Sequence, residues 1–167
     1  AGAQQTARAG VDFMAQELRL AGLDPLNMAG AGIEEISTDG IKIRFTSDSC
    51  DVEIGESGTC DNPVPDGNVN GKNERVSYWY DAGSRVLRRY LYEGTTSQAW
   101  TPLLEQVEPN PGNVSLFTFR DGNDSPTTVL GDIRTVTITL TVQEPAGRSK
   151  TVTRTYSSRV RLRNIGL

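Results

Sequence analysis

The sequence contains no histidine, only two cysteines and no long apolar run. Without histidine, the chain cannot form a Ser-His-Asp or Cys-His catalytic group, and it lacks the commonest protein ligand for zinc and copper. Two cysteines alone cannot complete a structural zinc site. No segment approaches the roughly 20 consecutive apolar residues of a membrane-spanning helix. We therefore expect a structural or binding protein with no catalytic residues.

The length of 167 residues fits one domain, which we place over residues 1–167. A chain of about 150 residues buries roughly 70% of its unfolded surface, so it needs no dense disulfide framework. The net charge of −4 is unevenly distributed, because residues 148–167 contain six basic residues and no acid. In an acidic chain this segment indicates an exposed basic strand, and we expect no nucleic-acid partner.

Helical periodicity covers residues 3–23. Gly22 and the following Asp24-Pro25 predict the end of this helix, since glycine accepts a left-handed conformation and proline cannot continue a helix. Four apolar residues recur at spacings of four, three and four and form one stripe: Ala7, Val11, Met14 and Leu18.

We place a β-rich head over residues 33–164, in which several segments alternate as strands do. Strand patterns cover 41–45, 76–80, 85–92, 114–120, 133–142 and 152–162. The pairs 76–80/85–92 and 133–142/152–162 predict antiparallel hairpins. We expect residues 93–113 to be irregular, with Trp100, Leu103 and Leu104 in the core. Because no βαβ alternation is present, we predict an α+β fold in which an N-terminal helix packs on antiparallel sheet.

The order of residues in segment 5–25, QTARAGVDFMAQELRLAGLDP, is more specific than helical periodicity alone requires. These residues resemble the segment that follows the transmembrane part of a minor type IV pilin of the PilW kind, related to the type II secretion pseudopilin GspJ (PulJ). Residues 76–89 are similar to a hairpin of that family, and residues 158–164 to its closing strand. The three segments together extend over most of the chain.

The resemblance implies a pilin-like structural subunit that assembles into or primes a type IV pilus or a type II secretion pseudopilus, near its tip. Its partners would be other minor pilins or pseudopilins and the major pilin. The family's basic leader, cleavage-site glycine and apolar half-helix do not occur in residues 1–167. The resemblance therefore implies that residues 1–23 are the C-terminal half of the pilin helix. The missing half would anchor the protein in the inner membrane, with the domain in the periplasm and later in an extracellular filament.

We expect the apolar stripe Ala7, Val11, Met14 and Leu18 to be an assembly face. Its C-terminal part should pack on the sheet. Its N-terminal part should stay exposed in the isolated domain, because the helix of a filament subunit meets neighbours on several sides.

Residues 47–74 lack any apolar period and predict a long surface loop. Cys50 and Cys60 lie within it, and their spacing differs from the Cys-x-x-Cys of redox pairs. We predict a structural disulfide formed outside the cytoplasm.

Residues 66–71 match the first half of a calcium-binding loop, with oxygen-bearing side chains at Asp66, Asn68 and Asn70. Glu74 occupies the ninth position of such a loop, whereas the twelfth, where a bidentate glutamate is expected, is a serine. Two interpretations stay open, a calcium site and a turn-rich loop, and the composition favours the second. No cofactor other than calcium is indicated.

Two further patterns have a functional and a structural interpretation. Glu34 and Glu35 are adjacent carboxylates; such pairs can serve glycoside hydrolysis, but we interpret these two as an exposed turn or strand edge. Several aromatic residues of the first predicted hairpin are candidates for a stacking surface or for cross-strand pairs. The alternative function is therefore a secreted or surface binding or adhesin module stabilised by calcium.

Overall fold

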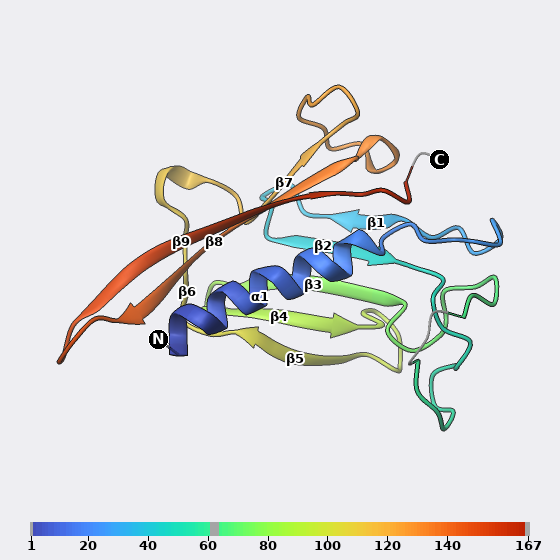
Figure 1. The fold of residues 1–167 in the computed structure, drawn as a ribbon, viewed down its shortest axis with the longest axis horizontal. Coiled ribbons are helices and arrows are strands. Elements are labelled where there is room, and N and C mark those ends of the chain that lie inside the picture. Colours follow the sequence, from blue (N-terminus) through green and yellow to red (C-terminus); the bar gives the residue numbers. More distant parts are fainter. Residues whose placement is uncertain (1, 61–63, 166–167) are drawn as a thin grey trace.

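The structure is a computed structural model that describes residues 2–60 and 64–165, with side chains from residue 6 onward. One helix, α1 (Gly2–Arg19), precedes two antiparallel sheets (Figure 1). The first sheet has strands in sequential order: β1 (Ile33–Ile36), β2 (Lys42–Thr46), β3 (Arg75–Asp81), β4 (Val86–Leu91) and β5 (Ala99–Leu104). The second contains β6 (Val107–Glu108), β7 (Phe117–Arg120), β8 (Thr135–Pro145) and β9 (Thr151–Arg161). The short 3₁₀ helices η1 (Pro111–Asn113) and η2 (Leu130–Asp132) lie between its strands.

Both predicted hairpins are confirmed. Strands β3 and β4 pair antiparallel, and the turn between them is closed by the Asp81 carboxylate, which accepts hydrogen bonds from the Gly83 amide and the Ser84 hydroxyl. Strands β8 and β9 pair along their full length, from Thr135 opposite Arg161 to Pro145 opposite Thr151. Alternation between apolar and polar residues sets this register, because a slip of one residue would turn every apolar side chain to solvent.

The core is enclosed by the inner faces of the two sheets and the buried stripe of α1. Tyr78 of β3 contacts Phe45 of the same sheet and Phe117 of the second sheet, with ring centroids 5.8 and 6.4 Å apart. From the second sheet, Val136, Ile138 and Leu140 point into this core and are fully buried. The Tyr80 hydroxyl also donates a hydrogen bond to the Val107 carbonyl of β6, 2.8 Å away, and so ties the sheets together.

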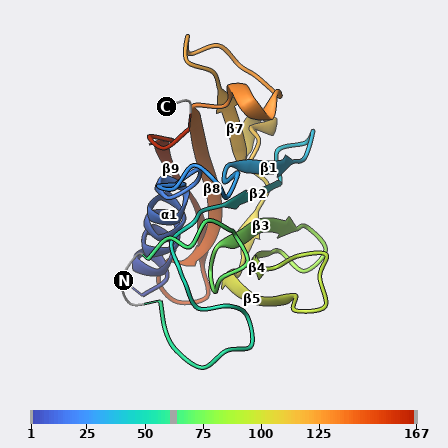
Figure 2. The same ribbon diagram turned by 90° about the vertical axis from the view of Figure 1, so that its right-hand side faces the viewer.

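Helix α1 runs across the first sheet and alongside β8 and β9 (Figures 1 and 2). Its close approach to β5 depends on Gly10, because a Cβ atom there would lie 2.7 Å from the Leu104 side chain. The helix ends at Arg19, four residues before the predicted end. Gly22 then adopts a φ of 81° and donates to the Thr46 carbonyl, which confirms it as the stop signal.

The predicted fold class is wrong. The chain is mainly β, and its described residues form a sandwich-like arrangement of two antiparallel sheets with one α-helix, in place of a helix packed on sheet. The error arose in residues 93–113, expected to be irregular, which contain β5 and β6. Residue 102 of β5 is a proline, and β6 is only two residues long, so neither has the alternation that reveals a strand.

Candidate functional site

The predicted disulfide is present. Cys50 and Cys60 are bonded, with their Cα atoms 5.4 Å apart. The side chain of Cys50 is buried, whereas that of Cys60 is partly accessible to solvent. The bond closes a ring within residues 47–74 and restricts the freedom of this loop in the unfolded chain.

Three carboxylates come together beside the disulfide. Oxygen atoms of Asp48, Asp66 and Glu74 all lie within 4.8 Å of one another, an arrangement that can hold a metal ion. Two of the four residues of the sequence motif, Asp66 and Glu74, belong to this cluster. Asp48 lies just after β2 and outside the motif, and from the sequence it is one of several acids near the disulfide that could assist a site but are better interpreted as solvating the loop.

Asn68 and Asn70, the other two residues of the motif, make local turn contacts. The Asn68 side-chain oxygen accepts a hydrogen bond from the Asn70 amide, and its side-chain nitrogen points to Glu53. The Asp66 carboxylate in turn accepts from the Asn68 amide. These contacts are the local turns that Asx residues favour, so the D-x-N-x-N pattern is accounted for by turn formation.

The two buried carboxylates of the cluster hold the loop through its backbone. Glu74 is 1% exposed and accepts hydrogen bonds from the amides of Ser49, Cys50 and Gly71. Asp48, fully buried, accepts from the amides of Asp66 and Gly67. Burial raises the pKa of Glu74, and the nearby charge of Asp66 adds to this, against the lowering effect of the three amides.

The expected exposure of the helix stripe is wrong at its N-terminal end. Ala7 and Val11 are 1% and 4% exposed, and Met14 and Leu18 are fully buried. The stripe is therefore core along its whole described length. The expectation failed because the β8–β9 hairpin and β5 extend far enough to cover the first turns of α1.

A different face of α1 is open to solvent. Phe13 on the helix and Leu20, the residue directly after its end, lie seven residues apart on one side, with 39% and 45% of their surface exposed. Ala9 and Gln16 are exposed on the same side. The Arg89 guanidinium lies 5.5 Å from the centre of the Phe13 ring and supports it from the sheet.

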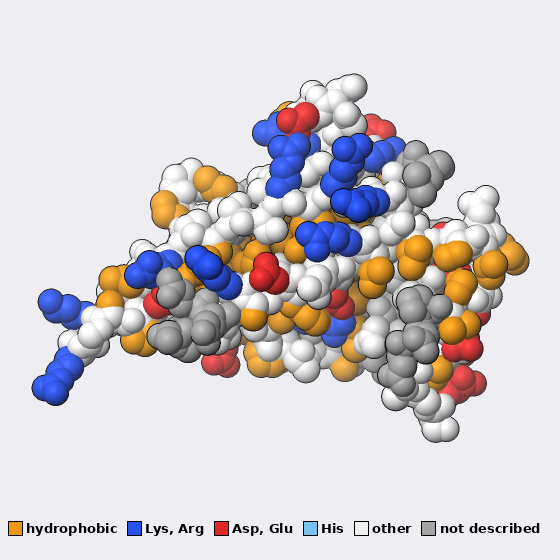
Figure 3. Space-filling view, in the orientation of Figure 1, with side chains coloured by type: hydrophobic (Ala, Val, Ile, Leu, Met, Phe, Trp, Pro, Cys, Tyr) orange, Lys and Arg blue, Asp and Glu red, His pale blue; other side chains and the backbone are white. Residues whose placement is uncertain are grey.

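The basic segment forms β9, as an exposed strand. Lys and Arg side chains spread across the face of the molecule shown in Figure 3. Two of the arginines of β9 make ion pairs within the domain, Arg154 with Glu144 and Arg159 with Asp124. The positive charge of this strand is thus partly compensated by acids of the same sheet and its turns.

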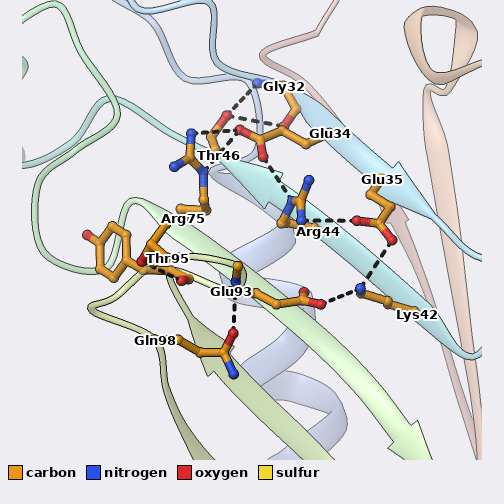
Figure 4. A network of polar contacts seen from close by, with 12 residues as sticks. Gly32, Glu34, Glu35, Lys42, Arg44, Thr46, Arg75, Glu93, Thr95 and Gln98 are labelled. Atoms are coloured by element: carbon orange, nitrogen blue, oxygen red, sulfur yellow. Dashed lines mark hydrogen bonds and ion pairs between the residues drawn. The ribbon is translucent and has the colours of Figure 1, made fainter.

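Charged residues form a connected network on the outer face of the first sheet (Figure 4). Arg44 binds both Glu34 and Glu35, at 2.9 and 3.0 Å. A register shift between Ile33 and Glu35 lets both carboxylates reach this arginine, although neighbours on a regular strand point in opposite directions. The strand-edge interpretation of Glu34 and Glu35 is therefore confirmed. Their ion pairs with Arg44 were not predicted from the sequence.

Lys42 extends the network to Glu35 and Glu93. Burial opposes the charge of the lysine, but its hydrogen bonds to Glu93 and Glu35 prevail and raise its pKa. Burial likewise opposes ionisation of Glu93, and the contact with Lys42 lowers the pKa of that carboxyl. Both groups are thus charged at neutral pH.

An aromatic cluster adjoins this network. Tyr90 lies between Trp79 and Trp100, with centroid distances of 6.2 Å to each ring. The Arg88 guanidinium stacks 4.2 Å from the centre of Trp100 and 5.3 Å from that of Trp79. Trp100 is 47% exposed, so its expected place in the core is wrong, whereas Leu104 is buried as expected.

Comparisons with protein-family models, with curated proteins and with solved structures found no match to this chain. Among the described residues, no helix combines the length and the apolar character needed to cross a bilayer.

Proposed function

We propose that this domain is the globular part of a minor pilin or pseudopilin of the PilW/GspJ kind, a filament subunit without catalytic activity. The proposal rests on the resemblance of residues 5–25. It places the protein in the inner membrane and periplasm and later in a type IV pilus or pseudopilus. Its partners are other minor pilins or pseudopilins and the major pilin.

The observation that carries the proposal is the division of α1 into two faces. One apolar stripe fixes the helix in the domain, while a second apolar face with Phe13 and Leu20 stays open. A helix that only completed its own domain would need the first stripe alone. An exposed apolar face rimmed by polar residues is typical of a protein contact, and here it provides the contact with neighbouring subunits.

The experiment replaces Leu20 or Phe13 with Asp in the full-length protein and measures filament assembly in cells. Val129→Asp is the matched control, because Val129 is 58% exposed and belongs to the η2 region of the second sheet. We expect assembly to fail for Leu20→Asp and Phe13→Asp and to proceed for Val129→Asp. The melting temperature of the isolated domain should change little for all three. Normal assembly of both helix variants would contradict the proposal.

The second candidate is a secreted or surface binding or adhesin module stabilised by calcium. The observation in its favour is the convergence of Asp48, Asp66 and Glu74 next to the disulfide. Such a module needs no filament partners. Filament assembly that is unchanged by Leu20→Asp and Phe13→Asp, together with stabilisation of the domain by calcium, would favour this candidate.

A further inference from the structure

The cavity next to the aromatic cluster has the composition of a small-ligand site. It has a volume of about 380 Å³ and is lined by Lys42, Trp79, Tyr90, Glu93 and Gln98. This volume lies within the range of roughly 300–1,000 Å³ that is usual for ligand pockets. The lining combines two aromatic walls with three polar side chains, and so pairs apolar contact with directional hydrogen bonding.

The polar side chains of the cavity differ in where their hydrogen-bonding atoms lie. Glu93 is directed inward, because its Oε1 accepts from Lys42 and its Oε2 is buried next to the Ser77 hydroxyl, a contact that lowers the pKa of Glu93. The side-chain oxygen of Gln98 accepts from the Gly94 amide, which leaves its exposed NH₂ group able to donate to a ligand. A ligand that carries hydroxyl acceptors would bond to this group.

The charge of the cavity selects an uncharged ligand. Lys42 is neutralised by Glu35 and Glu93, so no positive charge is left for a phosphate or a carboxylate. The rings also disfavour a flat aromatic ligand, because Trp79 and Tyr90 are tilted by 57° and present no pair of parallel faces. A saturated ring with C–H groups on its faces and hydroxyls around its rim fits both constraints.

We propose that this cavity binds a neutral pyranose sugar. The C–H face of the sugar packs on Trp79 and Tyr90, and its hydroxyls bond to the NH₂ group of Gln98. A second sugar unit of a longer glycan extends over Trp100, whose ring is half exposed and is held in place by Arg88. The site is independent of the open face of α1 and therefore of the assembly proposal.

The two tryptophans of the chain, Trp79 and Trp100, both belong to this surface, so tryptophan fluorescence, excited selectively over tyrosine, reports on it alone. The probes are glucose, galactose, mannose and N-acetylglucosamine with their short oligomers, titrated to about 50 mM, a range that detects binding of about −4 kcal/mol. We expect a saturable change in emission with at least one of these sugars. No saturable change with any of them would overturn the proposal.

Calorimetry on variants then locates the site. Trp79→Ala and Gln98→Ala should each weaken binding about tenfold or more, which corresponds to about 1.4 kcal/mol. Gln98 is exposed, so its replacement leaves the fold intact even if Trp79→Ala does not fold. Val129→Ala is the control and should bind as the wild type does. Equal affinity of Gln98→Ala and wild type, or preferential binding of adenosine monophosphate, would contradict the proposal.

Discussion

Glu17 of α1 and Arg89 of β4 form a two-pronged ion pair across the boundary between helix and sheet. The Nε and Nη2 atoms of Arg89 donate to the two carboxylate oxygens of Glu17 at 2.8 and 2.5 Å, and the Tyr78 hydroxyl donates to the same carboxylate. Both charged side chains are more than four-fifths shielded from solvent. This contact fixes the rotation of the helix and so decides which of its faces is buried.

Replacing Glu17 with Ala should destabilise the domain by roughly 3 kcal/mol, because the Arg89 charge and the Tyr78 hydroxyl would lose their shared partner inside the protein. Chemical denaturation measures the difference. Glu35→Ala is the control, since Glu35 is 41% exposed and its ion pairs should contribute less than about 1 kcal/mol. Equal effects of the two variants would mean that the helix is held by apolar contacts alone.

Ala7→Glu should destabilise the domain by more than about 2 kcal/mol, because Ala7 is buried against β5 and β8 and the new charge would have no partner there. Ala9→Glu is the matched control, two residues along the same helix but exposed, and should change stability by less than about 0.5 kcal/mol. Thermal unfolding compares them. Similar melting temperatures would show that the first turns of α1 are not packed as described.

Stability should fall as the pH rises above about 10. Burial raises the pKa of Tyr92 to about 12 and that of Tyr78 well above its usual value, so the folded state keeps protons that the unfolded state releases near pH 10. Because the unfolded state then binds fewer protons, stability declines between pH 10 and 12. Tyr92→Phe should reduce this decline. Absorbance at 295 nm should show late ionisation of these tyrosines, and simple titration of all five near pH 10 would refute the assignment.

Reduction of the Cys50–Cys60 bond should lower stability by roughly 3 kcal/mol, through the added freedom of the unfolded loop. Thermal unfolding with and without reductant measures this loss. The double variant Cys50→Ala/Cys60→Ala should have the melting temperature of the reduced protein, and reductant should not change it. Mass spectrometry of the native protein should find no free thiol. Two alkylatable cysteines would contradict the bond and the predicted formation outside the cytoplasm.

Calcium at about 100 times its dissociation constant should stabilise the wild type by roughly 2.7 kcal/mol, and a chelator should reverse this gain. Asp66→Asn should abolish the response, because Asp66 belongs to the carboxylate cluster and is exposed enough to be replaced without loss of the fold. Asp51→Asn, another exposed acid of the same loop, should respond as the wild type does. Melting temperatures that calcium does not change would contradict a metal site and would leave Asp48 and Glu74 with a structural role alone, as acceptors for backbone amides of the loop.

Regular periodicity made most of the fold predictable. The stripe of α1, the β3–β4 hairpin and the β8–β9 hairpin all follow from local alternation, which reports burial directly. Strand β5 was missed because residues 99–102 are exposed and include a proline, so they carry no apolar alternation. The division into two sheets could not be inferred either, because local alternation does not say which strands pair beyond the two hairpins.

The candidate sites were less predictable, since they depend on contacts between distant residues. The motif at Asp66 lies 18 residues from Asp48, and only the folded loop brings these carboxylates together. Trp79 and Trp100 belong to β3 and β5, the two strands that flank β4. Arg88 of β4 lies between their rings and contacts Trp79. The exposure of Ala7 was misjudged for the same reason, because the strands that cover it come from the C-terminal half of the chain.

The coding sequence directly upstream of Ala1 tests the proposed function most directly. We predict that it encodes a short basic leader, a glycine at the cleavage site, and an apolar segment of roughly 20 residues that continues in phase into α1. Such a segment would join the helix to a membrane and to a filament core. A conventional cleaved signal peptide directly before Ala1, without the apolar half-helix, would contradict the proposal that this domain is part of a pilin.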